Sequence, residues 1–212
     1  RAVISMRPTI VIPTYNEAAH IETVVQGFLR TAYPHLQEIL VVDGGSTDGT
    51  PAIVERMAQA DARVRLLHNP LKIQSAALNI AIHAARSDIF LRADAHADYA
   101  PDYVERCVEV LVATNALNVG GAQRFVAEQP FQAGVALAAR SFLGHGGAKY
   151  RDPTYEGYAE TVYLGCFWQW ALDELVRECQ EVQPVVTGET KEQRAMRSPF
   201  DLAQVTNQDS EL

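Results

Sequence analysis

Three short polar segments contain the residues whose types and spacing could do chemistry. Each follows a short apolar run: Pro-Thr-Tyr-Asn-Glu occupies positions 13–17, Asp-Gly-Gly-Ser-Thr-Asp-Gly-Thr positions 43–50, and Asp-Ala-His-Ala-Asp positions 94–98. Asp94 and His96 are two residues apart, so in an extended loop both side chains can point toward one metal ion. Carboxylate oxygen and imidazole nitrogen favour a hard divalent cation such as Mg²⁺ or Mn²⁺, which also bridges phosphate oxygens.

A nucleotide diphosphate is the ligand that best fits these side chains. Asp43 can accept a hydrogen bond from a base N–H or a ribose hydroxyl, but it cannot hold a phosphate directly because like charges repel. The chain has neither a GxxxxGK[ST] sequence nor a GxGxxG sequence after its first apolar run, which excludes the P-loop and dinucleotide-binding classes. Taken singly, residues 43–50 are also typical of a capped glycine-rich turn, and residues 94–98 of a solvated loop.

The order of apolar and amphipathic segments predicts the elements that position these residues. Four strand–helix units in series predict an α/β fold with a mainly parallel central sheet and helices on both faces. Ligands bind at the carboxyl ends of the strands in such a sheet, so the three polar segments are expected at one rim. Strands are expected at 9–12, 39–42, 64–67, 89–91, 118–123 and 160–164. One helix is expected after an N-cap at Asn16 and another from Thr50, and further helices over 75–85, 102–113, 131–140 and 170–178. A loop is expected at 144–157.

Composition restricts the class of protein. The chain has 212 residues, with 18 Lys and Arg against 26 Asp and Glu; the resulting net charge of −8 argues against nucleic acid as a partner. This length favours one domain. The three cysteines form no CxxC pair, which favours a reducing compartment, and no apolar run approaches the roughly 18 residues needed to span a bilayer. We therefore expect an acidic, cytoplasmic domain.

The polar segments, in their order and spacing, resemble those of a known family. Val-Ile-Pro-Thr-Tyr-Asn-Glu at 11–17, Val-Asp-Gly-Gly-Ser-Thr-Asp-Gly-Thr at 42–50 and Asp-Ala-His at 94–96, leading to Pro-Asp at 101–102, resemble a family 2 glycosyltransferase with the GT-A fold. The resemblance covers about residues 8–170. Asp-Ala-His in place of Asp-x-Asp is most similar to the glucosyltransferase branch that makes succinoglycan-type exopolysaccharide and extends a lipid-linked sugar.

The resemblance implies a role for each matching residue. Asp94 and His96 would bind Mg²⁺ or Mn²⁺, and Asp94 would also face the nucleotide. Lys72 would contact the diphosphate, and Asp43 would bind the uracil or the ribose. The remaining residues expected to line the nucleotide are Pro13, Thr14, Tyr15 and Glu17.

The end of the chain resembles the part of the family that activates the acceptor. Phe-Asp at 200–201 and Asn-Gln-Asp-Ser-Glu-Leu at 207–212 match the stretch leading to the family's base motif, which makes Asp209 the expected general base. Asp209 would deprotonate an acceptor hydroxyl as it attacks the anomeric carbon, and this single displacement inverts that centre. Proton transfer of this kind contributes about 10²–10⁴-fold. An acidic, solvated terminus is the alternative interpretation.

Together these patterns predict one GT-A catalytic domain over residues 1–212, truncated at its C-terminus. Residues of about 8–125 would bind the nucleotide-sugar, and about 126–212 would form the acceptor side. The expected reaction moves a sugar, expected to be glucose, from a UDP-sugar to a lipid-linked saccharide acceptor in exopolysaccharide or cell-envelope glycan synthesis. Parts absent from this chain would attach the protein to the cytoplasmic face of a membrane.

Two alternative functions stay open at this point. A sugar-nucleotide nucleotidylyltransferase has a similar sheet and similar metal-binding carboxylates, but it normally carries a glycine-rich loop with Arg or Lys after its first strand. A non-catalytic nucleotide-binding fragment is favoured by residues 173–198, which do not resemble the family, and by the early end of the chain.

Overall fold

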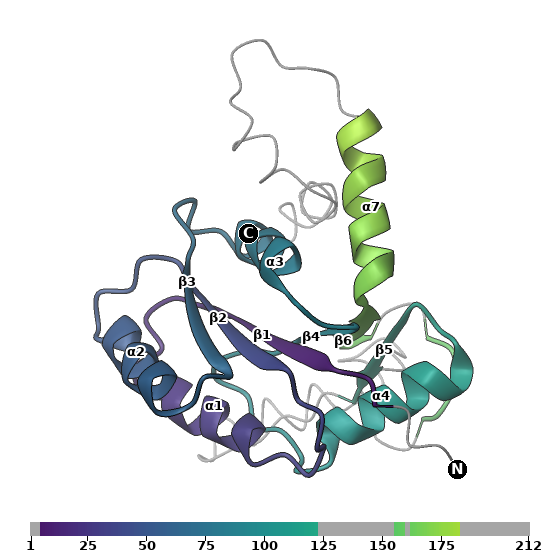
Figure 1. Ribbon diagram of the computed structural model, residues 1–212, viewed down its shortest axis with the longest axis horizontal. Coiled ribbons are helices and arrows are strands. Elements are labelled where there is room, and N and C mark those ends of the chain that lie inside the picture. The colour runs from purple at the N-terminus through teal and green to yellow at the C-terminus, as the bar shows by residue number, and fades with distance from the viewer. Residues whose placement is uncertain (1–4, 123–154, 160–161, 183–212) are drawn as a thin grey trace, which may run out of the picture.

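A six-stranded sheet runs through the part of the chain that the computed structural model describes, residues 5–122, 155–159 and 162–182 (Figure 1). Its strand order is β3-β2-β1-β4-β6-β5; β1 to β4 are parallel, and β6 is antiparallel to both of its neighbours. The strands are β1 (Pro8–Thr14), β2 (Glu38–Asp43), β3 (Val64–His68), β4 (Ile89–Arg92), β5 (Asn118–Gly121) and β6 (Tyr163–Trp168). The helices are α1 (Ile21–Leu29), α2 (Thr50–Ala60), α3 (Gln74–Ala84), α4 (Tyr103–Thr114) and α7 (Gln169–Val182).

Alternate residues of the central strands face two apolar cores, one on each side of the sheet. Ile10 and Leu91 pack with α1, α2 and α4, whereas Val11 and Phe90 pack with α3 and α7 (Figure 1). Strands buried on both faces need apolar side chains at nearly every position, which explains the unbroken apolar runs of the sequence. The predicted α/β architecture, mainly parallel and covered by helices on both faces, is confirmed. None of the described helices is long and apolar enough to cross a membrane.

Two predicted elements are wrong in their bounds because tertiary contacts set them. Helix α1 begins at Ile21, so Asn16 is not its N-cap; Asn16 has a left-handed backbone, with φ of 55°, and bonds to a neighbouring loop. Strand β6 covers Tyr163–Trp168 rather than 160–164, since its antiparallel pairing with β4 and β5 sets its position.

The carboxyl ends of β1, β2 and β3 lie level with one another. Thr14 pairs with Asp43, and Asp43 pairs with His68. Strand β4 ends beside the middle of β1, where Arg92 pairs with Val11, so the following residues continue as a loop toward the same edge. The polar segments after β1, β2 and β4 therefore leave the sheet at one rim, as predicted.

Some predictions fall on residues that the structure does not describe. The helix expected at 131–140, most of the loop expected at 144–157 and the general base Asp209 lie outside the described residues. So does most of the expected acceptor side, of which the described part is 155–159 and 162–182.

Candidate functional site

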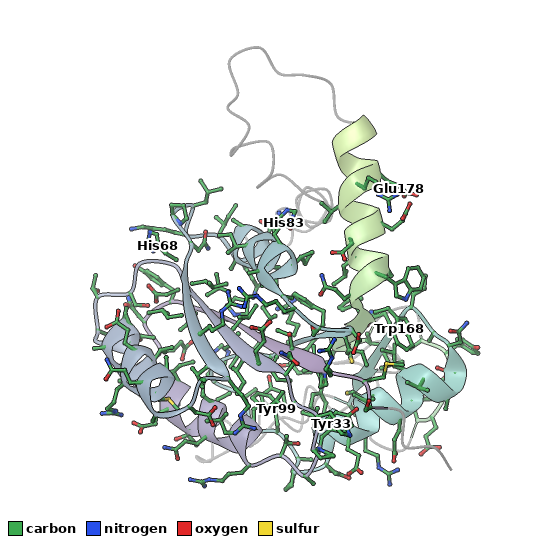
Figure 2. All side chains as sticks on the ribbon, in the orientation of Figure 1. Tyr33, His68, His83, Tyr99, Trp168 and Glu178 are labelled. Atoms are coloured by element: carbon green, nitrogen blue, oxygen red, sulfur yellow. The ribbon has the colours of Figure 1, made fainter. Side chains whose placement is uncertain are left out.

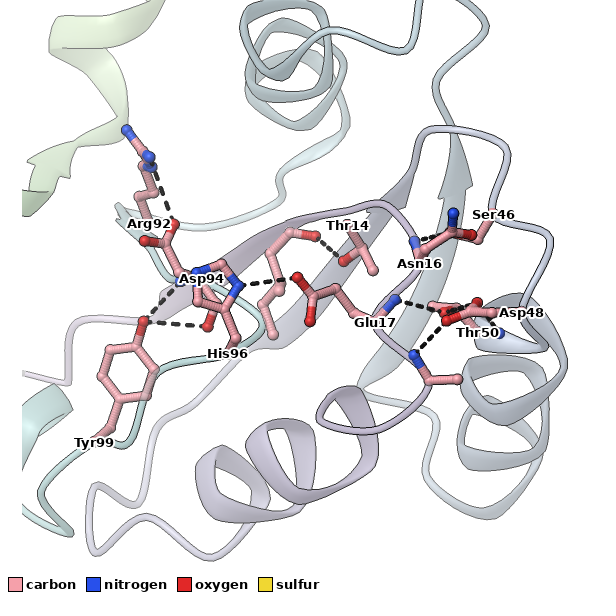
Figure 3. A network of polar contacts seen from close by, with 12 residues as sticks. Thr14, Asn16, Glu17, Ser46, Asp48, Thr50, Arg92, Asp94, His96 and Tyr99 are labelled. Carbon is pink, nitrogen blue, oxygen red and sulfur yellow. Dashed lines mark hydrogen bonds and ion pairs between the residues drawn. The ribbon is translucent and has the colours of Figure 1, made fainter. Parts of the chain in front are cut away.

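The loop after β1 and the loop after β2 are joined by hydrogen bonds that involve main-chain groups (Figure 3). The N–H of Asn16 donates to Oγ of Ser46 (2.8 Å), and Oδ1 of Asn16 accepts the N–H of Thr47 (2.8 Å). The N–H of Glu17 donates to Oγ1 of Thr50 (3.0 Å). Asn tolerates the left-handed backbone that these contacts need better than most residues do. We call this unit, residues 14–18 with 43–50, the loop brace.

Asp48 strengthens the loop brace with a carboxylate that bonds to both loops. Its Oδ2 accepts the N–H of Ala18 (2.9 Å), and its Oδ1 accepts the hydroxyl (2.6 Å) and the N–H (3.1 Å) of Thr50. Two hydrogen bonds hold the pKa of Asp48 below its usual value because their donors favour the ionised form. The larger effect comes from the hydroxyl of Thr50 and the next from the N–H of Ala18. The carboxylate of Asp48 therefore serves to hold the loop brace together.

Asp43 shapes the turn in which it lies. Its Oδ2 accepts the N–H groups of Gly45 (2.8 Å) and Ser46 (3.0 Å), and its Oδ1 accepts the hydroxyl of Ser46 (2.5 Å). The residue is only 4% exposed. Its expected contact with a base or a ribose stays a prediction, and it would use the acceptor capacity that Oδ1 retains.

Lys72 and Tyr15 lie beside the two glycines that follow Asp43. A Cβ atom on Gly45 would stand 3.4 Å from Cε and 3.7 Å from Nζ of Lys72, and one on Gly44 would stand 3.6 Å from the ring of Tyr15. Gly45 also has a left-handed φ of +83°, which disfavours any side chain there. The chain thus combines an exposed aromatic ring, a glycine pair and an ammonium group in one cradle, which is the chemistry that a base and a phosphate require.

Asn69 fixes the loop that carries Lys72. Its buried side chain accepts the N–H of Leu71 (3.2 Å) and donates to the carbonyl of Ile73 (2.9 Å), and its own N–H donates to the carbonyl of Asp43 (2.7 Å). Lys72 itself has a left-handed φ of 60°, so its position depends on this support. The sequence reasoning missed Asn69, and also Ser46 and Asp48 in the loop brace. The only feature of the sequence that could have indicated these residues is that Asn, Ser and Asp side chains often bond to the main chain in turns.

Asp94 lies at the other end of the site, where its carboxylate contacts one cation and one hydroxyl. Its Oδ1 is 3.5 Å from Nη2 of Arg92, and its Oδ2 accepts the hydroxyl of Tyr163 (3.3 Å). The hydroxyl of Tyr99 accepts a hydrogen bond from the N–H of Asp94 (2.7 Å). The ring of Tyr99 (Figure 2) packs against Phe28, with 4.7 Å between the ring centroids. Burial raises the pKa of Tyr99 well above its usual value, so this hydroxyl stays neutral. The backbone at Asp94 is thereby tied to the core.

His96 joins the Asp94 loop to the loop brace. Its Nδ1 lies 2.9 Å from Oε1 of Glu17, a residue 79 positions earlier in the chain (Figure 3). His96, one of the two predicted metal-binding residues, therefore contacts Glu17, a residue predicted to line the nucleotide; the other, Asp94, lies two residues before His96 in the same loop. Neither His96 nor the other described histidines, which include His68 and His83 (Figure 2), belong to a group of three or more His, Cys, Asp or Glu able to hold a metal among the described residues.

The residues present fit a divalent cation that is shared with a diphosphate. Mg²⁺ commonly takes one or two protein carboxylates and completes its coordination with phosphate oxygens and water, so a cage of three protein ligands is not required. Asp94 supplies a carboxylate that already attracts the cationic Arg92, and His96 supplies an imidazole whose Nε2 bonds no described residue. The donor set of one carboxylate and one imidazole suits Mn²⁺ or Mg²⁺.

Pro13 and Thr14 reach this rim chiefly through their main chain. The hydroxyl of Thr14 donates to the carbonyl of Ile12 (3.0 Å), and the carbonyl of Thr14 accepts the N–H of Gly44 (2.9 Å). Pro13 is half-buried within β1, whereas Tyr15 is 56% exposed. Contacts of these three residues with a nucleotide stay predictions, and Tyr15 has the most accessible side chain of the three.

A cavity of about 320 Å³ lies between α1 and the residues that precede α4, apart from the cradle. Its walls include Gly27, Arg30 and Asp98, and none of the predicted site residues lines it. We place the candidate site at the strand ends because the polar groups converge there.

Comparison with known proteins identifies the family. The model of a family described as Glycosyl transferase family 2 matches residues 9–168, which extend from β1 to the end of β6. The chain belongs to glycosyl transferase family 2. Family membership accounts for the common rim of polar segments and for the succession of strands and helices that carries it.

Two relatives are similar to this family 2 chain over more than half of its length. The succinoglycan biosynthesis protein ExoA from Rhizobium meliloti is 44% identical over 153 residues, which cover 71% of this chain and 46% of that protein. Polyprenol monophosphomannose synthase from Mycolicibacterium smegmatis is 33% identical over 55% of this chain and 46% of that protein. The chain thus spans less than half the length of either relative.

Solved structures of glycosyltransferases confirm the GT-A fold. The mannosyltransferase PcManGT from Pyrobaculum calidifontis, in complex with GDP-Man and Mn²⁺, has a TM-score of 0.57 and 27% identity over 80% of this chain and 46% of that one. TarS from S. aureus, in complex with UDP, has a TM-score of 0.57 and 17% identity over 80% of this chain and 48% of that one. The second likeness shows the fold alone.

Proposed function

We propose that this chain binds a nucleotide-sugar donor and a divalent cation as part of a glycosyltransferase that acts in exopolysaccharide or other glycan synthesis. The observation that carries the proposal is the convergence of the four loops that follow β1, β2, β3 and β4. It places Tyr15 and Lys72 at a glycine cradle, while Glu17 contacts His96 two residues from Asp94. The similarity to a succinoglycan biosynthesis protein supports the glycan class.

The cation would be Mg²⁺ or Mn²⁺, held by Asp94 and His96. When bound, it supplies positive charge that stabilises the leaving diphosphate. Lys72 would add a second positive charge from the opposite loop, and the exposed ring of Tyr15 would stack on the base. The Mn²⁺ complex of the mannosyltransferase with 27% identity supports a divalent cation.

For the donor we propose a UDP-sugar, with glucose as the sugar, and for the acceptor a lipid-linked saccharide. The family resemblance of the Asp-Ala-His motif supports this choice, although the solved neighbours include complexes with GDP-Man as well as with UDP. The nucleotide-sugar half would comprise about residues 8–125, and the acceptor side would follow it. Membrane attachment and a cytoplasmic location belong to the same proposal.

Calorimetric titration of the chain with UDP, GDP and UTP, each with and without Mn²⁺, tests the donor site. We expect UDP to bind with Mn²⁺ and much more weakly without it, and Asp94→Ala to abolish the dependence on metal. Asp98→Ala is the matched control, because Asp98 is an exposed carboxylate of the same loop outside the proposed metal site. Preferential binding of GDP would overturn the uridine assignment, and equal UDP binding without metal would overturn the metal site.

Asp209 is proposed as the general base that deprotonates the acceptor hydroxyl, so that one displacement inverts the anomeric centre. Asp209→Asn is expected to lower sugar transfer by about 10²–10⁴-fold while UDP affinity is retained. Glu211→Gln, which changes a carboxylate close to Asp209 in sequence, is the control and is expected to leave sugar transfer and UDP affinity unchanged. Normal turnover of the Asp209 variant would contradict the assignment.

A nucleotidylyltransferase and a non-catalytic nucleotide-binding fragment remain the competing functions. Membership of glycosyl transferase family 2 supports sugar transfer over nucleotidyl transfer. Release of pyrophosphate from UTP and a sugar 1-phosphate would favour the nucleotidylyltransferase. Tight UDP binding with no sugar transfer or donor hydrolysis would favour the non-catalytic fragment.

A further inference from the structure

The contact between Glu17 and His96 joins two loops that are distant in sequence. Nδ1 of His96 lies 2.9 Å from Oε1 of Glu17. The carboxylate is largely enclosed, with 19% of its side chain exposed, whereas the imidazole is 64% exposed. The main chain of Glu17 is held by the bond from its N–H to Oγ1 of Thr50 (3.0 Å), and its carboxylate is the more enclosed partner of the pair.

This contact determines which nitrogen of His96 carries the proton. A neutral imidazole has one N–H and one lone pair, and an ionised carboxylate can only accept a hydrogen bond. Bonding to Glu17 therefore places the proton on Nδ1 and leaves the lone pair on Nε2. No described side chain bonds Nε2, so this nitrogen is the one available to a ligand.

We propose that Glu17 is a positioning residue for His96: it holds the ring in the Nδ1–H tautomer and presents Nε2 to the cation beside Asp94. This inference rests on the proposed function, and it replaces a direct contact of the Glu17 side chain with the nucleotide. Histidine ligands of metals commonly donate their second nitrogen to a carboxylate in this way, and loss of that carboxylate costs about 10–100-fold in affinity or activity. An aspartate at position 96 would have no tautomer to fix and no need of Glu17.

Nuclear magnetic resonance of the metal-free chain tests the tautomer directly. Two-bond ¹H–¹⁵N correlations of His96, recorded where the imidazole is neutral, are expected to show the Nδ1–H form in the native chain. Glu17→Ala should shift the ring toward the Nε2–H form. Glu17→Gln should retain the Nδ1–H form, because the amide oxygen accepts the same hydrogen bond. An Nε2–H tautomer in the native chain would overturn the proposal.

A double-mutant cycle measured by Mn²⁺ titration, with UDP present, separates positioning from nucleotide contact. Glu17→Ala is expected to weaken Mn²⁺ binding about 10–100-fold in the native background and to have little effect in the His96→Asp background. Equal losses in both backgrounds would mean that Glu17 acts on the nucleotide or the fold, and would overturn the proposal. Glu17→Gln should restore most of the affinity.

Glu22→Ala provides the matched control for these variants. Glu22 is a carboxylate at the start of α1 that pairs with Arg56 on the surface (2.7 Å), so its removal should leave the tautomer and the Mn²⁺ affinity unchanged. If the native chain bound neither UDP nor Mn²⁺, the proposed function would fail together with this inference. Metal-dependent UDP binding without coupling between Glu17 and His96 would overturn this inference alone.

Discussion

The two ends of the candidate site are built differently. At the nucleotide end, the loop brace and Asn69 hold Lys72 and the glycine pair through hydrogen bonds to main-chain groups. At the proposed metal end, the carboxylate of Asp94 contacts only side chains among the described residues, Arg92 at 3.5 Å and Tyr163 at 3.3 Å. The proposed nucleotide end is thus held in place before a ligand binds, whereas a cation at Asp94 would compete with contacts that its carboxylate already makes.

Because the two ends are supported differently, different residues should affect the two ligands. Removal of a main-chain support should change the shape of the cradle and the stability of the fold together, because polar groups of the backbone lose their partners. Removal of a side-chain contact of Asp94 should change cation affinity with little effect on stability.

Asn69→Ala should produce the largest change at the nucleotide end. The substitution removes a buried acceptor and a buried donor, which should lower the free energy of unfolding by about 2 kcal/mol. It should also weaken UDP binding about tenfold, equivalent to ~1.4 kcal/mol, because Lys72 loses its support. Chemical denaturation and calorimetry measure the two effects. Asn115→Ala, at the left-handed end of α4, is the control for stability loss without loss of UDP affinity.

Gly45→Ala should destabilise the cradle, and Gly27→Ala should not. The positive φ of Gly45 makes a side chain cost about 1–2 kcal/mol, although its Cβ would stand at an ordinary contact distance, 3.4 Å, from Cε of Lys72. Gly27 is an exposed residue of α1 with no atom within 4 Å of an added Cβ, so alanine there should stabilise the helix by about 0.5–1 kcal/mol. Thermal or denaturant unfolding distinguishes the two. Similar stability changes in both variants would contradict the assignment of strain to Gly45.

Tyr163→Phe tests the proposed metal end. Loss of the 3.3 Å hydrogen bond removes a contact with which a cation would have to compete at Asp94, so Mn²⁺ affinity should rise about twofold. This increase corresponds to the low end of the free energy that one hydrogen bond contributes. Tyr33→Phe removes a hydroxyl that bonds the carbonyl of Met6 and serves as the control. A marked loss of Mn²⁺ affinity for the Tyr163 variant would show that Asp94 needs this support.

The loop brace should depend on pH through Asp48, with the smallest effect of the four. The folded-state pKa of Asp48 is lowered, so its stabilising contribution is complete above the ordinary aspartate pKa of about 3.9 and is lost as the pH falls through the lower folded-state value. Asp48→Asn should therefore be less stable than the native chain at neutral pH, and the difference should shrink in acid. Denaturant unfolding across this pH range provides the measurement. A difference that is independent of pH would contradict the role of the charge.

The sequence predicts the elements well wherever burial decides them. The strand expected at 39–42 appears as Glu38–Asp43, and the helix start expected at Thr50 is confirmed. Prediction from local periodicity fails for the bounds of β6, because antiparallel pairing with β4 and β5 sets them. It also fails at Asn16, whose contacts with Ser46 and Thr47 come from another loop.

The family, the parallel α/β architecture and the three polar segments can be recognised in the amino-acid sequence, because apolar runs and short motifs are local properties of the chain. How those segments contact one another is visible only in the folded chain. Asn69 supports Lys72, the loop brace commits Asp48, and Glu17 bonds His96 across 79 positions. The contacts of Asp48 and Glu17 depend on which strands lie side by side in the sheet, and no local pattern of residue types encodes that order.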